Sequence, residues 1–142
     1  MKMSHLLAFA IGALLLPGVS IIKQSNAQSN HHVFELRMYR ANPGKLEAVQ
    51  ARFRDHTEAI FKRHNMKSIG YWVPEDVPDS NNLFIYLLEH PSRQDAEKNW
   101  TAFINDPEWK KARAASEANG VLVEDKNVQR YFMDPTSFSA LK

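Results

Sequence analysis

Hydrophobic and polar residues alternate strictly along residues 33–40. One set of alternate positions is wholly apolar and consists of Phe34, Leu36 and Met38. The positions between them hold Glu35, Arg37 and Tyr39. Because successive side chains of a β-strand point to opposite faces, we predict a strand with one apolar face. The charged residues on its other face need ion-pair partners, a wet pocket or solvent.

After this strand, the spacing of the apolar residues changes to that of a helix. The sequence Asn42-Pro43-Gly44 is typical of a helix start, with Asn as the N-cap and Pro in the first turn. Helical spacing then continues to about Asn65, with an apolar stripe formed by Leu46, Val49, Phe53 and Ile60. The prediction is a helix over residues 42–65 with His56 inside its apolar stripe.

Two further strands and a second helical region follow. Strands are predicted over residues 67–73 and 83–89, joined as an antiparallel hairpin, and the second of them is apolar on both faces. Ser92 followed by Asp95 indicates a capping box that opens a helix. Asp106-Pro107 restarts the helix, which is predicted to end near residues 119–120. A last strand is predicted over residues 127–133.

The predicted order of elements is therefore β-α-β-β-α-β. This is the order of the ferredoxin-like fold, an α+β fold in which a four-stranded antiparallel sheet carries its helices on one face. In a monomer the other face should be polar, but the last two strands are apolar on both sides. We therefore predict a homodimer in which a second copy covers the open sheet face. In the alternative, a monomer covers this face with its tail around Phe138 and Leu141.

The N-terminal segment is predicted to direct export rather than to fold. A short positive start and an apolar run precede Ser25-Asn26-Ala27, which places small residues at the −3 and −1 positions of a cleavage site. The chain then divides into a signal peptide at 1–27, a polar leader at 28–32 and one domain at 33–142. The expected location is the periplasm or the exterior, with no stable membrane span once the signal is removed. The alternative is an uncleaved membrane anchor formed by residues 6–22, a run that is short for a span.

Composition and charge narrow the possible functions. The 142-residue chain carries 18 Lys and Arg against 16 Asp and Glu, and the predicted signal holds two of the lysines and no acid. The domain is thus close to neutral, which argues against nucleic-acid binding. The sequence has no cysteine, which excludes thiolate nucleophiles and Cys-ligated metal sites. It contains no recognisable cofactor or metal motif, so neither is predicted.

A few residues are candidates for a ligand site. Arg37 in a pocket would suit a carboxylate or a phosphate, through forked hydrogen bonds. His56 is a candidate catalytic base, since histidine titrates near neutrality; alternatively it is a core histidine bonded to a backbone carbonyl. Aromatic side chains that would either line the pocket or fill the core are Trp72, Tyr86, Trp100 and Trp109.

The sequence also resembles the NIPSNAP family. The resemblance rests on the order and spacing of the strings FELRMY at 34–39, PGK at 43–45, GYW at 70–72, DPEW at 106–109 and PTSFS at 135–139. It spans about residues 33–142 and implies a dimeric α+β barrel, but it brings no settled reaction. The recurring residues of the family correspond here to Glu35, Arg37, Tyr39, His56, Trp72 and Trp109.

Two functions are compatible with these observations. The first is an exported homodimer that binds a small apolar or aromatic ligand, or another protein, with candidate ligand-binding residues Arg37, Tyr39, His56, Trp72, Tyr86 and Trp109. The second is implied by resemblance to the wider superfamily: a cofactor-independent monooxygenase, or a haem-binding or haem-degrading enzyme, with His56 as base or axial ligand. We favour the first, because the second takes its chemistry from relatives and not from residues of this sequence.

Overall fold

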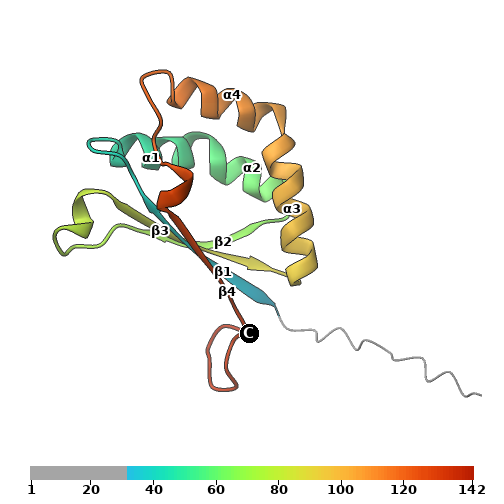
Figure 1. The fold of residues 1–142 in the computed structure, drawn as a ribbon. Coiled ribbons are helices and arrows are strands. Elements are labelled where there is room, and N and C mark those ends of the chain that lie inside the picture. The colour runs from blue at the N-terminus through green and yellow to red at the C-terminus, as the bar shows by residue number, and fades with distance from the viewer. Residues whose placement is uncertain (1–31) are drawn as a thin grey trace, which may run out of the picture.

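The computed structural model describes residues 32–142 (Figure 1). The predicted signal peptide at 1–27 and the leader up to residue 31 lie outside the described residues, so export and membrane anchoring stay predictions. Between residues 32 and 142, no helix is long and apolar enough to cross a membrane.

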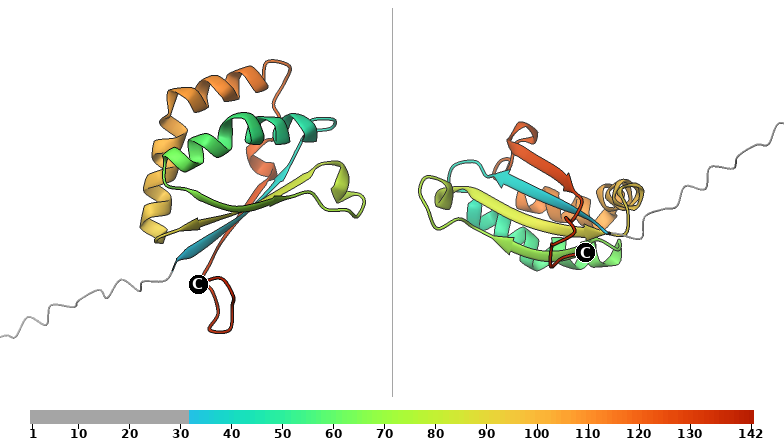
Figure 2. Two further views of the ribbon diagram at one scale, coloured as in Figure 1. Left: turned by 180° about the vertical axis from the view of Figure 1, so that it is seen from behind. Right: turned by 90° about the horizontal axis from the view of Figure 1, so that it is seen from below.

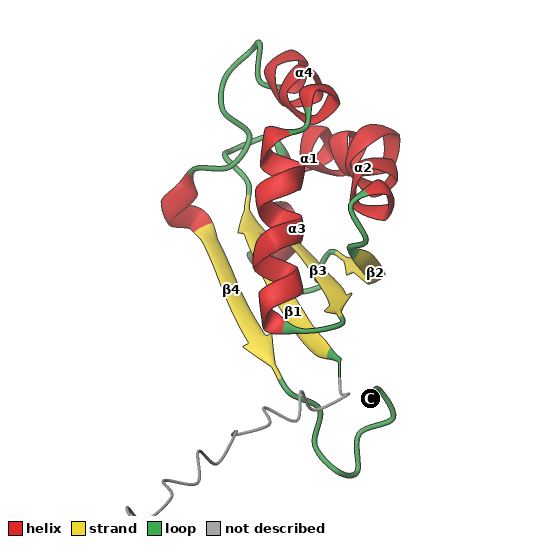
Figure 3. Cartoon of the chain, turned by 90° about the vertical axis from the view of Figure 1, so that its right-hand side faces the viewer, coloured by secondary structure: helices red, strands yellow, loops and turns green. Residues whose placement is uncertain are grey.

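Four strands form one antiparallel sheet. Its central strands are β1 (Val33–Arg40) and β3 (Leu83–His90), and its edge strands are β2 (Lys67–Trp72) and β4 (Val128–Met133). The order across the sheet is β2-β3-β1-β4, which Figure 3 shows along its width. All the α-helices lie on one face of this sheet (Figures 1 and 2). The predicted ferredoxin-like α+β fold is confirmed.

The first helical region contains a turn that the amphipathic pattern did not predict. It consists of α1 (Leu46–Arg52), a π-helical turn (Phe53–Thr57) and α2 (Glu58–Arg63). A π-turn adds one residue to the helix and so rotates the face that follows it. As a result Thr57 is buried, whereas His56 is exposed. The prediction that His56 belongs to the apolar stripe is wrong.

This helical region also begins later than predicted. Gly44 has a positive φ of 72°, so residues 42–44 form a turn that precedes the helix. The Asn42 side chain does not cap the helix but donates a hydrogen bond of 2.8 Å to the Val121 carbonyl. The helix itself starts at Leu46.

The second helical region follows the prediction closely. α3 (Arg93–Asn105) opens at Ser92, whose hydroxyl accepts a hydrogen bond of 3.0 Å from the Asp95 amide. α4 (Pro107–Ser116) opens at Asp106, whose carboxylate accepts hydrogen bonds from the first amides of that helix. Because Asp106 has an extended backbone, the chain changes direction between α3 and α4 (Figure 1). As a result α3 packs against the sheet at β3, whereas α4 packs against α1 and the π-turn.

The core lies between the helices and the sheet and is mainly aromatic. Phe53, from the π-turn, sits at its centre, with its ring centroid 4.8 Å from that of Phe84 and 5.0 Å from that of Tyr86. Phe61 and Phe103 continue the cluster, with ring centroids 4.8 Å apart. Such tilted and edge-on contacts are the favoured arrangement of aromatic rings.

The opposite face of the sheet carries no helix and is apolar. Its side chains come from alternate positions of all four strands: Leu36, Met38, Trp72, Ile85, Leu87, Tyr131 and Met133. We call this set the open face. Trp72 and Tyr131 are 50% and 53% exposed, and Phe138 in the C-terminal tail is 88% exposed. The Phe138 side chain therefore does not shield the open face.

Candidate ligand-binding cavity

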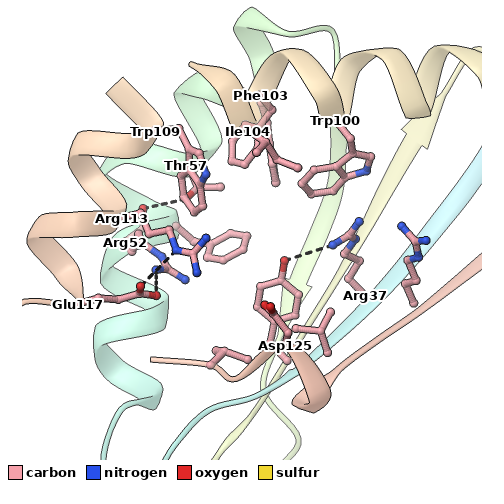
Figure 4. A pocket seen from close by; sticks show the side chains of 16 residues that line it. Arg37, Arg52, Thr57, Trp100, Phe103, Ile104, Trp109, Arg113, Glu117 and Asp125 are labelled. Atoms are coloured by element: carbon pink, nitrogen blue, oxygen red, sulfur yellow. Dashed lines mark hydrogen bonds and ion pairs between the residues drawn. The ribbon is translucent and has the colours of Figure 1, made fainter. Parts of the chain in front are cut away.

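A cavity of about 480 Å³ lies between the helices and the sheet (Figure 4). Strands β1 and β4 contribute Arg37, Tyr39, Val128 and Arg130 to its lining. The first helical region contributes Arg52, Phe53, Thr57 and Phe61. The rest of the lining comes from α3, α4 and the chain that follows: Trp100, Phe103, Ile104, Trp109, Arg113, Glu117, Val123 and Asp125. The cavity thus combines aromatic surface with arginine side chains.

Behind one end of the cavity, a fully buried carboxylate organises the polar groups. Glu35 accepts hydrogen bonds from Arg37 Nε at 2.7 Å and from Trp100 Nε1 at 2.6 Å. It also accepts one from His90 Nε2 at 3.0 Å. Burial by itself would raise the pKa of Glu35, but these hydrogen bonds and the nearby charge of Arg37 outweigh it and lower the pKa. Glu35 is therefore held as a carboxylate that fixes three neighbouring side chains.

Arg37 is the cationic side chain that this carboxylate positions. Its guanidinium carbon lies 3.8 Å from the centroid of the Trp100 ring, and Nη1 donates a long hydrogen bond of 3.5 Å to the Tyr39 hydroxyl. Burial alone would lower the pKa of Arg37, but the neighbouring oxygens of Tyr86 and Glu35 hold it above its ordinary value. Arg37 is thus a permanent charge with a fixed orientation at the cavity wall.

Tyr39 connects this polar group to the aromatic core. The Tyr86 hydroxyl donates a hydrogen bond of 2.7 Å to the Tyr39 hydroxyl, and the two rings meet edge to face. Tyr86 is fully buried, and burial raises its pKa well above the ordinary value. The Tyr86 phenol is therefore held in the neutral form that can donate and accept hydrogen bonds.

The opposite end of the cavity has a second charged cluster. Arg52 Nη1 donates a hydrogen bond of 2.9 Å to Glu117, which also pairs with Arg113 at 3.2 Å (Figure 4). The Arg52 guanidinium lies 5.2 Å from the Trp109 ring centroid. Burial would raise the pKa of Glu117, but the two arginines lower it. The Arg52 side chain is buried, and its Nε has no hydrogen-bond partner among the described residues.

The structure brings some of the predicted site residues together and separates others. Arg37, Tyr39 and Trp109 line the cavity, and Tyr86 supports Tyr39 from behind. Trp72 lies on the open face, on the other side of the sheet.

His56 lies on the outer surface of the helices. It lines a groove between the first helical region and α4, next to Asp55, Glu108 and Lys111. It does not line the cavity, and the reason is again the π-turn, which turns Thr57 inward in its place. A role for His56 as a base or an axial ligand inside the cavity is therefore not supported by its position.

Sequence reasoning missed the partners of Glu35. His90, which lies just beyond the predicted strand at residues 83–89, is fully buried, and Glu89 is nearly so. The alternation of buried residues along β3 extends through Phe84, Tyr86 and Leu88 to His90, so this pattern carried a usable signal. No sequence pattern indicated the ion pair between Arg52 and Glu117, because the two residues are far apart in sequence. Among residues 32–142, no group of three or more His, Asp or Glu side chains is placed to hold a metal ion.

With its four-stranded antiparallel sheet and a cavity between sheet and helices, this chain belongs to the small α+β proteins of ferredoxin-like fold. Within that class the chain is a member of the NIPSNAP family, whose model matches residues 34–140. No curated protein sequence matches the chain.

Solved structures of the same family agree with this assignment. A NIPSNAP family protein from Agrobacterium tumefaciens is 25% identical, with a TM-score of 0.67 over 79% of this chain and 100% of that one. A second one from the same organism, described as of unknown function, is 23% identical, with a TM-score of 0.66 over 80% and 96%. The chain is also similar to a monooxygenase of Streptomyces coelicolor in complex with nanaomycin D, at 16% identity and a TM-score of 0.53 over 80% and 95%. At this identity the last likeness concerns the fold alone.

Proposed function

We propose that this protein is an exported, homodimeric module whose cavity binds a small apolar or aromatic ligand. The observation that carries the proposal is the cavity of about 480 Å³ with Trp100, Phe103 and Trp109 in its walls. This volume lies in the range of small-molecule sites, which are lined mainly by apolar and aromatic side chains with a few fixed polar groups. Arg37 is such a fixed group, because Glu35 and Trp100 hold it.

The ligand proposal is tested with N-phenyl-1-naphthylamine, a neutral aromatic dye that fluoresces in apolar sites. The wild-type protein should bind this dye. Ile104 is half exposed and lines the cavity, so Ile104→Trp should obstruct it and weaken binding. Val121→Trp is the matched control, because Val121 is similarly exposed and does not line the cavity. Equal binding by wild type and Ile104→Trp, or no binding by either, would contradict the proposal.

The open face supports the homodimer. It places contiguous apolar side chains from all four strands in solvent, including Trp72 and Tyr131, and such patches are typical of interfaces. A second copy related by twofold symmetry would present the same surface and bury both. We expect wild-type protein to sediment as a dimer at micromolar concentration and Trp72→Glu as a monomer. Val121→Glu, which adds the same charge elsewhere, should stay dimeric. A monomeric wild-type protein would overturn this part of the proposal.

The proposed export is supported by the apolar run and by the small residues around Ala27. Mass spectrometry of the protein recovered from its own cells should show a chain that begins at Gln28. Recovery of the chain with residues 1–27 intact would favour the membrane anchor formed by residues 6–22.

The alternative function, that of an oxygenase or a haem protein, depended on His56 as base or axial ligand. The exposed position of His56 on the outer surface removes the group that would have served as base or axial ligand in the cavity. No other observation at the cavity favours that function over ligand binding, so we propose binding alone.

A further inference from the structure

We propose that the ligand of this cavity is an aromatic or apolar acid whose oxyanion is held between Arg37 and Arg130. This inference rests on the proposed function, because it assigns a chemical class to the ligand of the same cavity. The inference is based on two arginines on neighbouring strands. The site predicted from the sequence included Arg37 but not Arg130.

The strand register places the two arginines side by side. Arg37 of β1 is paired directly with Arg130 of β4, and both side chains line the cavity. Residues that face each other across an antiparallel pair have Cβ atoms about 4.5–5.5 Å apart. Like charges at that spacing destabilise a sheet unless an anion lies between them.

Among residues 32–142, only one of these two cations, Arg37, pairs with a carboxylate, and the hydrogen-bonding capacity of that carboxylate is already used. Glu35 is buried behind Arg37 and accepts hydrogen bonds from Arg37, Trp100 and His90. Arg130 forms no ion pair with any residue between 32 and 142, and it is an exposed residue of the cavity lining. One positive charge at this end of the cavity is therefore without a counterion from residues 32–142.

The other carboxylates of the cavity do not neutralise this pair. Glu117 is engaged by Arg52 and Arg113 at the opposite end (Figure 4). Asp125 is exposed at the rim, and no ion pair within 4 Å joins it to Arg130. Within the described part of the chain, the cavity lining thus has an excess of positive charge that is concentrated on the sheet.

The geometry of Arg37 suits an oxyanion. Arg37 Nε donates to Glu35, and among residues 32–142 the terminal nitrogens of Arg37 have only the 3.5 Å contact of Nη1 with Tyr39, so they keep donor capacity. Guanidinium groups bind planar oxyanions through paired, charge-assisted hydrogen bonds. Nε of the buried Arg52, which has no hydrogen-bond partner within residues 32–142, adds a further donor to the cavity lining at the opposite end.

The other side chains that line the cavity indicate that the rest of the ligand is apolar. Trp100 covers Arg37, and Phe103, Ile104 and Trp109 continue the apolar surface from there. A flat apolar body would lie against these side chains while its acid group reached the two arginines. The ligand class that fits both features is an aromatic organic acid.

The test compares two dyes that share their rings and differ in charge. One is neutral N-phenyl-1-naphthylamine, and the other is 1-anilinonaphthalene-8-sulfonate, which adds one oxyanion. The variant is Arg130→Gln, whose exposed site should tolerate the change. The matched control is Arg54→Gln, which removes the same charge from an exposed site outside the cavity. Dissociation constants are measured by fluorescence titration at one ionic strength.

We expect the sulfonate to bind wild type and Arg54→Gln about tenfold more tightly than the neutral dye, the ratio that a charge-assisted hydrogen bond provides. Arg130→Gln should lose most of that ratio and keep its affinity for the neutral dye. Binding of the neutral dye with no preference for the sulfonate, or a preference that Arg130→Gln retains, would overturn this inference and leave the proposed function standing. Binding of neither dye would overturn both.

Discussion

Loss of the buried carboxylate of Glu35 should cost the domain a large part of its stability. Glu35→Gln keeps the size of the side chain but replaces one acceptor oxygen with an amide that faces N–H donors. Three donors at 2.6–3.0 Å then share one oxygen, and the Arg37 guanidinium is left without its counterion. Breaking a buried ion pair in this way costs about 3–5 kcal/mol. The whole stability of such a domain is about 5–15 kcal/mol.

Equilibrium urea unfolding at neutral pH and constant protein concentration measures this loss, followed by tryptophan fluorescence. Glu97→Gln is the matched control, because Glu97 also pairs with an arginine, Arg93, but both of these side chains are exposed. The control should lose less than about 1 kcal/mol. A loss for Glu35→Gln no larger than that of the control would refute the reasoning.

Further expectations follow from the same contacts. The pKa of Glu35 is lowered in the folded state, so its stabilising effect is complete above about pH 4.3, the value of an unfolded glutamate. The difference in unfolding free energy between wild type and Glu35→Gln should therefore narrow as the pH falls below that value; a constant difference would contradict the assignment. Ser92→Ala should cost about 1 kcal/mol in urea unfolding through loss of the α3 cap, while Ser137→Ala in the exposed tail should cost nothing measurable. A Cβ at Gly70 would come within 2.7 Å of the Trp72 ring, so Gly70→Ala should displace that ring and weaken dimerisation in sedimentation experiments with little change in monomer stability.

Much of the fold could be predicted from the sequence, because the apolar and polar residues recur at the spacings of strands and helices. The alternation in residues 33–40 predicts both the strand and the residues that share each face. Which face the helices cover could not be predicted from that pattern. The structure places Glu35, Arg37 and Tyr39 under the helices and leaves the apolar side of β1 on the open face. The partners that make this possible, Trp100 and His90, come from distant parts of the chain.

The site was predicted in part, for reasons that individual residues make clear. The strand alternation places Arg37 and Tyr39 on one face of β1, and both of them line the cavity, as does Trp109. His56 could not be placed, because a π-turn leaves no local signal that the helical count has changed by one residue. Arg130 was missed since its significance depends on the β1–β4 register, which only tertiary structure defines.

The most direct test of the account is to locate a bound ligand within the domain. The chain has three tryptophans, and each gives one indole N–H signal in a two-dimensional nitrogen–proton NMR spectrum. Trp100 and Trp109 line the cavity, whereas Trp72 lies on the opposite side of the sheet. Titration with 1-anilinonaphthalene-8-sulfonate should shift the Trp100 and Trp109 signals and leave that of Trp72 in place. A shift confined to Trp72 would contradict the cavity as the binding site.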